Sequence, residues 1–278
     1  MTMYKAFSPG AVGVKLPIED CAPLAKKHGF EGIYIDARWA QQVGPEHALD
    51  VLGGLRPAGF GLPFDYRIDT AEFSGKVLEL ENIAAAAAAV GCNRCSTWIP
   101  SWHDRMPYDE NFQFHRRRLQ WIANVLAEQG VSFGLEFLGT KTLRDGHPYP
   151  FIHTLDELLS LFFETASDNL GVLLDSWHWY TSGGTVEQIR KLQSRQVVDV
   201  HINDAPAGVP LDKQLDGVRA LPGETGVIDI AGFLGALKFI GYDGPVMAEP
   251  FSQKVREMAP EQAIAATAAA IDKVWPKA

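Results

Sequence analysis

The sequence predicts an α/β fold, a single (β/α)8 TIM barrel over residues 1–278, on two observations. Eight short apolar runs alternate with eight segments of helical character along the whole chain, which is the order of a parallel barrel ringed by helices. An open doubly wound sheet is the competing fold, but no GxGxxG follows the first apolar run. Glycines recur where helices return to strands, as C-caps require, at Gly29, Gly59, Gly91, Gly130, Gly171 and Gly241.

In the first half, short apolar runs predict strands at residues 11–14, 32–36, 60–64 and 95–99. Helices are expected between and after them. The first covers residues 18–28 and is ended by Gly29, and the second covers residues 45–55. The third, over residues 71–90, is rich in alanine and glutamate, which favour helix, and the fourth covers residues 111–129.

In the second half, strands are expected at residues 133–137, 171–175, 197–202 and 245–248. The run at 171–174 consists only of small and apolar residues, which is typical of a parallel strand buried on both faces. Helices are expected at residues 155–167, with Thr154 as N-cap, and at 185–193, 230–240 and 260–274.

Charge and composition restrict the partners. A net charge of −9 argues against nucleic acid and anionic membranes, which select basic patches. The alanine run 84–89 is too short to span a membrane. Three cysteines and an N-terminus without an apolar run favour a cytoplasmic protein. The Cys92 and Cys95 pair has CxxC spacing but no second pair, so we interpret both as small core residues. A homo-oligomer stays open.

Three long loops follow predicted strands, at residues 100–110, 138–153 and 204–227. In a barrel they lie at the C-terminal face, where barrel enzymes carry their chemistry. The polar segment 213–219 could act as a lid or as a subunit contact.

Four predicted strands end in a metal-binding type of side chain: Glu136, Asp175, His201 and Glu249. One such residue alone would be read as a satisfied polar group, but four on consecutive strands favour a divalent metal. Three carboxylates with one imidazole suit Mn²⁺, Mg²⁺ or Co²⁺ better than a structural zinc site. Salt bridges could neutralise the acids instead, but no Arg or Lys occupies these strand ends.

The same strand ends resemble those of the xylose-isomerase-like TIM-barrel superfamily, and within it the sugar phosphate isomerase/epimerase group with the ketose 3-epimerases. The segments that carry the resemblance are Leu135-Glu136, Leu174-Asp175-Ser176-Trp177-His178, Val200-His201-Ile202-Asn203-Asp204, Pro222-Gly223-Glu224 and Ala248-Glu249-Pro250. The resemblance implies that Glu136, Asp175, His201 and Glu249 bind a divalent metal, most often Mn²⁺, with Mg²⁺, Co²⁺ or Zn²⁺ as alternatives.

The resemblance also implies a sugar isomerase or epimerase, in which Glu136 and Glu249 move protons on opposite faces of a metal-held enediolate. His178 matches a histidine that contacts a substrate oxygen, and Arg219 matches an arginine directed at the substrate. We also expect Trp102, an aromatic face at the barrel mouth, and Lys141, in the loop after the fifth strand, to bind the small sugar or keto-sugar.

The chain departs from the epimerases in one respect, because no second glutamate follows Glu136 in the segment 137–144. Three alternatives therefore remain. A lyase or dehydratase acting on a keto-sugar or inosose would use the same site. An AP-endonuclease-like phosphodiesterase would need more histidines at the strand ends than this chain has. A non-catalytic binding protein on a barrel frame is the third.

Overall fold

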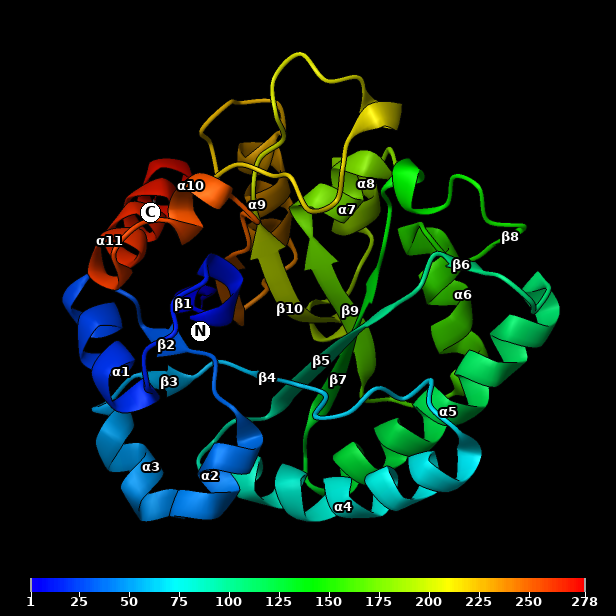
Figure 1. Cartoon of the computed structure of the whole chain (residues 1–278), viewed down its shortest axis with the longest axis horizontal. Helices are drawn as coiled ribbons and strands as arrows, with labels where there is room; N and C mark the ends of the chain where they lie inside the picture. Colours follow the sequence, from blue (N-terminus) through cyan, green and yellow to red (C-terminus); the bar gives the residue numbers. More distant parts are fainter. Residues whose placement is uncertain (1, 278) are drawn as a thin grey trace.

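Nine short parallel strands form one sheet in the computed structural model, which describes residues 2–277 (Figure 1). Their order is β3-β2-β1-β11-β10-β9-β7-β5-β4, and every neighbouring pair is parallel. The strands are β1 (Tyr4–Phe7), β2 (Gly32–Ile33), β3 (Arg56–Pro57), β4 (Phe60–Gly61), β5 (Arg94–Ile99), β7 (Ser132–Phe137), β9 (Leu170–Asp175), β10 (Val197–Ile202) and β11 (Pro245–Ala248).

The sheet closes into a barrel because β3 and β4 belong to one stretch of chain. β3 pairs with β2, and β4 pairs with β5. The residues beside them continue both ladders: the Ala58 N–H donates to the Ile33 carbonyl at 2.8 Å, and the Leu62 N–H donates to the Ser96 carbonyl at 2.8 Å. Residues 56–62 therefore serve as the third strand of an eight-stranded barrel, which confirms the predicted fold.

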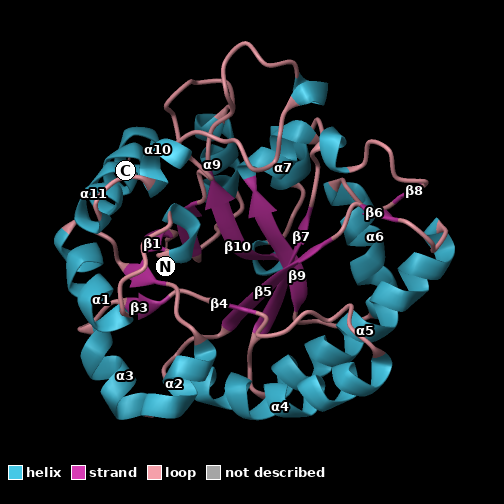
Figure 2. Cartoon of the chain, in the orientation of Figure 1, coloured by secondary structure: helices cyan, strands magenta, loops and turns pink. Residues whose placement is uncertain are grey.

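Helices surround the strands, as Figure 2 shows. They are α1 (Ile18–Lys27), α2 (Ala37–Val43), α3 (Pro45–Leu52), α4 (Thr70–Ala89), α5 (Tyr108–Glu128), α6 (Leu155–Thr165), α7 (Ser176–Thr181), α8 (Val186–Arg190), α9 (Ile230–Phe239), α10 (Gln253–Arg256) and α11 (Pro260–Val274). A separate antiparallel pair, β6 (Trp102–His103) with β8 (Tyr149–Pro150), joins two of the long loops at the barrel mouth.

The prediction for the first strand is wrong. The strand is β1 (Tyr4–Phe7), and the apolar run at 11–14 lies in and after the 3₁₀ turn Gly10–Val12. Ala11, Val12 and Val14 are all buried in this turn, so they have the apolar character of a strand without its conformation. Gly13 takes a φ of 77°, which reverses the chain there.

Three short helices, α2, α7 and α10, were not predicted from the sequence. In α7 (Ser176–Thr181) almost every side chain is buried, so no polar face marks it as a helix. Asp175 caps its first turn by accepting the Trp177 N–H at 2.6 Å. The helix expected at 185–193 is shorter, as α8 (Val186–Arg190), and α2 (Ala37–Val43) begins at the N-cap Asp36.

Cys21, Cys92 and Cys95 are free and fully buried, which confirms the core interpretation of the CxxC pair. Among residues 2–277, no helix combines the length and apolar character needed to cross a membrane.

His115 in α5 is a buried histidine away from the strand ends. Its ring lies among the rings of Tyr66, Phe114 and Phe151, with centroids 5.6, 5.3 and 5.0 Å away. Burial, with the charge of Arg67 as a smaller cause, lowers its pKa to about 3. In the native state His115 therefore stays unprotonated at pH values where the unfolded chain, in which a histidine has a pKa of about 6.5, is protonated.

This difference in pKa between the native and unfolded states predicts that the free energy of unfolding decreases as the pH falls from about 6.5 toward 3. The decrease due to His115 is about 1.4 kcal/mol per pH unit. In His115→Phe the ring remains and this loss disappears, so its unfolding free energy should decline less steeply with acid than that of the wild type. Urea unfolding between pH 7 and pH 4 measures both slopes. His47→Phe, at an exposed position of α3, is the control and should keep the wild-type slope. Equal slopes for His115→Phe and wild type would contradict a neutral His115.

Candidate metal and substrate site

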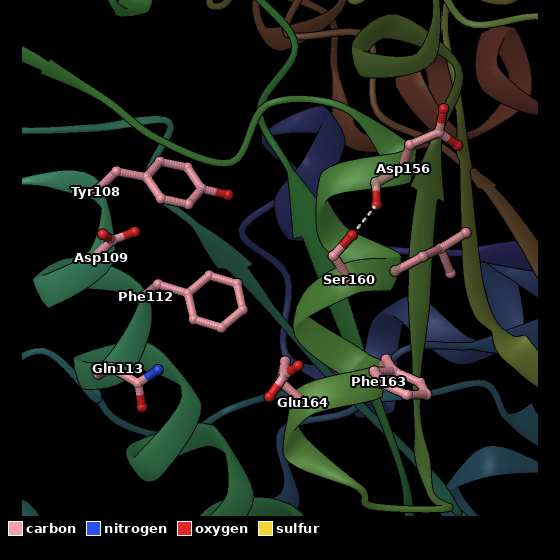
Figure 3. Close-up of a pocket in the computed structure, with 9 residues that line it drawn as sticks. Tyr108, Asp109, Phe112, Gln113, Asp156, Ser160, Phe163 and Glu164 are labelled. Atoms are coloured by element: carbon pink, nitrogen blue, oxygen red, sulfur yellow. Dashed lines mark hydrogen bonds between the residues drawn. The ribbon is translucent and has the colours of Figure 1, made fainter.

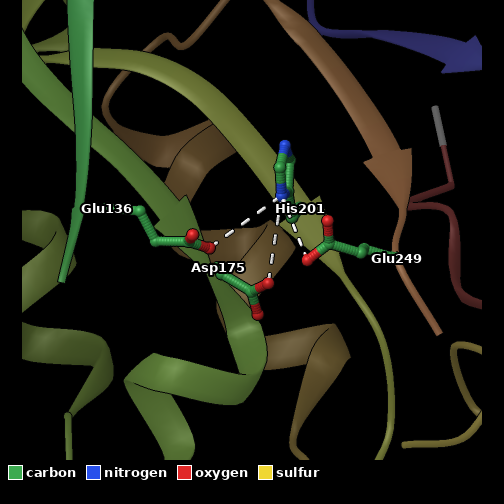
Figure 4. Close-up of side chains that lie close together, drawn as sticks. All are labelled: Glu136, Asp175, His201 and Glu249. Atoms are coloured by element: carbon green, nitrogen blue, oxygen red, sulfur yellow. Dashed lines mark ion pairs between the residues drawn. The ribbon is translucent and has the colours of Figure 1, made fainter. Parts of the chain in front are cut away.

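Four side chains meet at the carboxyl ends of neighbouring strands. Glu136 lies in β7, Asp175 ends β9, His201 lies in β10 opposite Asp175, and Glu249 directly follows β11. One ligand atom from each lies within 4.8 Å of the others. Figure 4 shows Glu136 and Glu249 reaching the cluster from opposite sides, with His201 and Asp175 between them. Within residues 2–277 this is the only group of three or more His, Cys, Asp or Glu side chains with such spacing.

The cluster has the properties of a cation site. His201 Nδ1 lies 4.0 Å from Glu136 Oε1, 3.9 Å from Asp175 Oδ2 and 3.6 Å from Glu249 Oε2, which are all too long for good hydrogen bonds. Glu136 Oε1 and His201 Nδ1 are buried and find no hydrogen-bond partner among residues 2–277, which costs stability. Three carboxylates and one imidazole around a common centre fit a divalent cation.

A buried carboxylate lies behind the far side of His201. Asp199, two residues earlier in β10, places Oδ2 3.8 Å from His201 Nε2, which is longer than a direct hydrogen bond. The Tyr34 hydroxyl and the Ser96 hydroxyl donate to the two Asp199 oxygens. The negative charge of Asp199 on that side favours a proton on Nε2, which leaves Nδ1 free for a metal. The sequence did not single out Asp199, because an acid in the middle of an apolar strand is not specific to a metal site.

The two glutamates have opposite electrostatic surroundings. Burial, together with the nearby Asp175 and Glu249 carboxylates, holds the pKa of Glu136 well above its usual range. Burial also acts to raise the pKa of Glu249, but the charges of His201 and Arg219 outweigh it and lower that pKa. Carboxylates whose pKa values are pushed apart are typical of acid–base pairs.

Arg219 corrects the expectation that no basic side chain neutralises these acids. It reaches the cluster from the long loop after β10, and its Nη1 lies 2.9 Å from Asp175 Oδ2 and 3.0 Å from Glu249 Oε2. Its Nη2 pairs with Asp216 Oδ1 at 3.0 Å. Since the Arg219 side chain is only 1% exposed, it forms a fixed part of the site.

His178, in α7, presents a neutral imidazole to the site. Its Nδ1 accepts the Gly139 N–H at 3.1 Å, which places the ring proton on Nε2, where it faces the Arg219 Nη2 donor at 3.3 Å. Burial and then the charge of Arg219 lower its pKa to about 3. Nε2 is 3.5 Å from Asp216 Oδ1 and 3.9 Å from Glu136 Oε1, next to the metal cluster. Residue 139 must be glycine, because a Cβ there would lie 2.2 Å from the His178 carbonyl oxygen.

A cavity of 670 Å³ opens above the cluster, a volume typical of small-molecule sites. Among its walls are four predicted site residues (Glu136, Glu249, His178 and Arg219) and the predicted aromatic Trp102. Trp102 is stacked on His147 with 3.5 Å between ring centroids.

Lys141 is not brought to this cavity. Its ammonium pairs instead with Asp145 at 2.8 Å, one helical turn along the chain. The contact between Lys141 and the substrate stays a prediction.

Two further cavity residues, Asp216 and Phe251, were missed. Phe251 takes a φ of 37°, an uncommon conformation for an aromatic residue, and its ring lies 4.4 Å from the Arg219 guanidinium. Asp216 stands three residues before Arg219, and this acid–base spacing is the only trace of it in the sequence.

A larger hollow of 850 Å³ lies elsewhere, between α5 and α6 on the outside of the barrel (Figure 3). Tyr108, Phe112 and Phe163 line it together with polar side chains. None of the four clustered ligands reaches it, so it is separate from the metal and substrate site.

Two known enzymes are similar in sequence to part of this chain. Inosose isomerase of Bacillus subtilis (strain 168) is 29% identical over 143 residues, which are 51% of this chain and 48% of that protein. The 3-dehydroshikimate dehydratase of Pseudomonas aeruginosa is 31% identical over 132 residues, 47% of this chain and 20% of that protein. The aligned part thus spans about half the length of the inosose isomerase and a fifth of the dehydratase.

Two solved structures share the whole fold. A xylose isomerase domain protein from Alicyclobacillus acidocaldarius is 27% identical, with a TM-score of 0.89 and 98% coverage of both chains. The IOLI protein, solved with a bound zinc atom, is 21% identical, with a TM-score of 0.81 and the same coverage. The profile of the family described as xylose isomerase-like TIM barrel matches residues 22–274, so the chain belongs to that family.

Proposed function

We propose that this protein is a divalent-metal-dependent enzyme that moves a proton next to the carbonyl group of a sugar, keto-sugar or inosose, giving isomerisation or epimerisation. The observation that carries the proposal is the convergence of Glu136, Asp175, His201 and Glu249 around unpartnered buried ligand atoms at the floor of the cavity. The inosose isomerase relative supports this substrate class.

The four clustered residues would hold the metal. A divalent cation there supplies Lewis-acid chemistry, which polarises a carbonyl and acidifies the neighbouring C–H bond. Hard oxygen ligands favour Mn²⁺, Mg²⁺ or Co²⁺, and the zinc in the IOLI structure makes Zn²⁺ an alternative.

Side chains of the protein would move the protons and orient the substrate. Glu249 and Glu136 reach the site from opposite sides, so Glu249 is suited to accept the proton from carbon and Glu136 to return one to the opposite face. The neutral His178 donates from Nε2 to a substrate oxygen, and Arg219 orients that oxygen while it balances the acids. Trp102 offers an aromatic face to the sugar.

Elimination is the second candidate, favoured by the similarity to 3-dehydroshikimate dehydratase. The same removal of a proton beside a carbonyl can be followed by loss of a β-hydroxyl instead of reprotonation. Glu136 would then protonate the departing oxygen, which leaves as water, while His178 holds it by a hydrogen bond.

Elemental analysis of the purified protein tests the metal site first. We expect about one equivalent of a divalent metal in the wild type and its loss in His201→Ala, because that variant removes the only nitrogen ligand. His28→Ala, at a partly exposed position just after α1, is the control and should retain the metal. A wild type that neither contains nor takes up any divalent metal would overturn the proposal.

A panel of keto-sugars and inososes in D₂O then separates the reactions. Deuterium in recovered substrate, an isomer or an epimer supports proton transfer, and a product that has lost one molecule of water supports elimination. Cytoplasmic location and a homo-oligomer stay predictions, for which cell fractionation and light scattering are the measurements.

A further inference from the structure

The cavity above the four clustered residues has two chemically different sides, which follow the order of the strands. The segments that follow β9, β10 and β11 supply polar groups to its lining: His178, Asp216, Arg219 and Glu249. The neighbouring strands β5 and β7, with the loops that follow them, supply an apolar wall: Trp98, Pro100, Trp102, Leu138 and Leu143. Glu136, near the end of β7, lies at the boundary between the two sides.

We propose that the apolar wall is a subsite for a neutral aromatic substituent of the substrate, which makes the substrate an aryl glycoside or a similar conjugate rather than a free sugar. The proposal deepens the proposed function and rests on it for the reaction at the polar side of the cavity. Binding of the aromatic group can be measured without that reaction.

Trp98 offers an accessible aromatic surface to such a ligand. It lines the cavity and is 42% exposed. In the register of the two parallel strands, Trp98 of β5 is the partner of Glu136 of β7. Neighbouring strands lie about 4.8 Å apart, so the indole and the carboxylate leave the sheet side by side and enter the same cavity. A substituent on a ring that reacts at Glu136 is therefore within reach of the indole.

An ion pair fixes Trp98 and keeps this part of the wall neutral. The Arg67 guanidinium lies 4.0 Å from the centre of the Trp98 ring. Asp65 accepts two hydrogen bonds from it, from Nε at 2.7 Å and from Nη2 at 3.0 Å. Because Asp65 balances the charge of Arg67, a substituent on the wall meets a paired guanidinium rather than a free one. A neutral aromatic group is therefore favoured over a phosphate or carboxylate.

The size and the rigidity of the cavity favour a planar substituent. Its volume of 670 Å³ is typical of sites for drug-sized ligands, which are larger than one sugar ring. Trp102, the second indole of the wall, is held by its stack on His147, with 3.5 Å between ring centroids. Fixed indoles bind a flat aromatic group better than an alkyl chain, because aromatic pairs gain from stacking and an ordered chain loses rotational freedom.

Fluorescence anisotropy with 4-methylumbelliferone, a planar aromatic probe without a sugar, tests the wall directly. The titration is run in EDTA and in mildly acidic buffer, where the probe is neutral. We expect the wild type to bind the probe and Trp98→Ala to bind it at least tenfold more weakly. Trp121→Ala is the matched control, because Trp121 is also 42% exposed but lies on α5 outside the cavity lining, and it should bind as the wild type does.

Trp98→Phe separates loss of the aromatic surface from damage to the fold. It keeps a ring at this position and should bind the probe within about threefold of the wild type. A wild type that does not bind the probe overturns the subsite, as does equal binding by wild type and Trp98→Ala. Binding by Trp98→Phe that is as weak as that by Trp98→Ala also overturns it, because the probe would then not be contacting the aromatic ring.

Competition decides the chemistry of the substituent. 2-Naphthol should displace the probe, and 1-octanol, which is also neutral and apolar but not planar, should displace it much less. Equal displacement would overturn the aromatic assignment. The β-D-glucoside of 4-methylumbelliferone should bind at least as tightly as the free probe, since the sugar then extends toward Glu136. A glucoside that no longer binds would overturn the link between the aromatic group and a sugar.

These results do not depend on the outcome for the proposed function. The free probe carries no sugar and the titration contains no metal, so a protein that binds no sugar still gives a definite answer about the wall. Failure of the subsite leaves the elemental analysis and the D₂O experiment to decide the proposed function.

Discussion

The Glu249→Gln variant is expected to lose turnover by a factor on the order of 10³, the size of effect that follows loss of a general base. Glutamine keeps the shape of the side chain and an oxygen for the Arg219 contact, which measures 3.0 Å to Glu249 Oε2. It cannot accept a proton from carbon, however, and it is a poorer metal ligand. Turnover rates measured at saturating divalent metal separate the two effects. Excess metal refills a weakened metal site, but it does not replace the lost general base.

Deuterium exchange is a second measurement on the Glu249→Gln variant. In D₂O, wild-type enzyme should place deuterium next to the carbonyl of recovered substrate, and Glu249→Gln should not. The control is Glu81→Gln, which makes the same charge change on the exposed face of α4 and should behave as wild type. Wild-type turnover of Glu249→Gln on every sugar tested would remove Glu249 from the proton pathway.

The barrel and the four clustered residues could be predicted because both depend on strands. Parallel strands in a barrel end at one rim, so residues that close four neighbouring strands meet there even if each boundary is off by a residue or two. Glu136, Asp175, His201 and Glu249 are placed in this way. Their roles stay predictions, whereas their proximity is an observation.

Arg219 was placed by the family resemblance alone, and Asp216 was not placed at all, because loop positions depend on long-range contacts. In the loop that carries both residues, Asp204 accepts the N–H groups of Thr225, Gly226 and Ile228, more than twenty residues away. No local pattern encodes that path. The case of Lys141 is different, because its partner Asp145 stands four residues along the sequence, a spacing that favours a local ion pair; its contact with the substrate stays a prediction.

Removal of Arg219 is expected to destabilise the metal-free protein strongly. Arg219 pairs with Asp175, Glu249 and Asp216, and Asp175 is fully buried. In Arg219→Met these carboxylates lose their counter-charge, and the fully buried Asp175 has no water to replace it. Removing one partner of a buried ion pair lowers the free energy of unfolding by about 3 kcal/mol or more. The Tm measured in EDTA should therefore fall by roughly 6 °C or more.

A divalent cation should restore much of that loss, because it binds among the same oxygens. In the wild type, Arg219 Nη1 already contacts Asp175 Oδ2 and Glu249 Oε2, so the cation must share these oxygens with a second positive charge. Without the guanidinium that repulsion is gone, and the rise in Tm on adding Mn²⁺ should be larger in Arg219→Met than in the wild type. Arg118→Met is the matched control: Arg118 is also buried, but it donates to the carbonyls of Tyr66 and Ile68. Its loss should lower Tm in EDTA without enlarging the response to Mn²⁺. Equal Mn²⁺ responses in Arg219→Met and wild type would mean that the arginine and the metal do not share these carboxylates, and the cation would then have to bind outside the four-residue cluster.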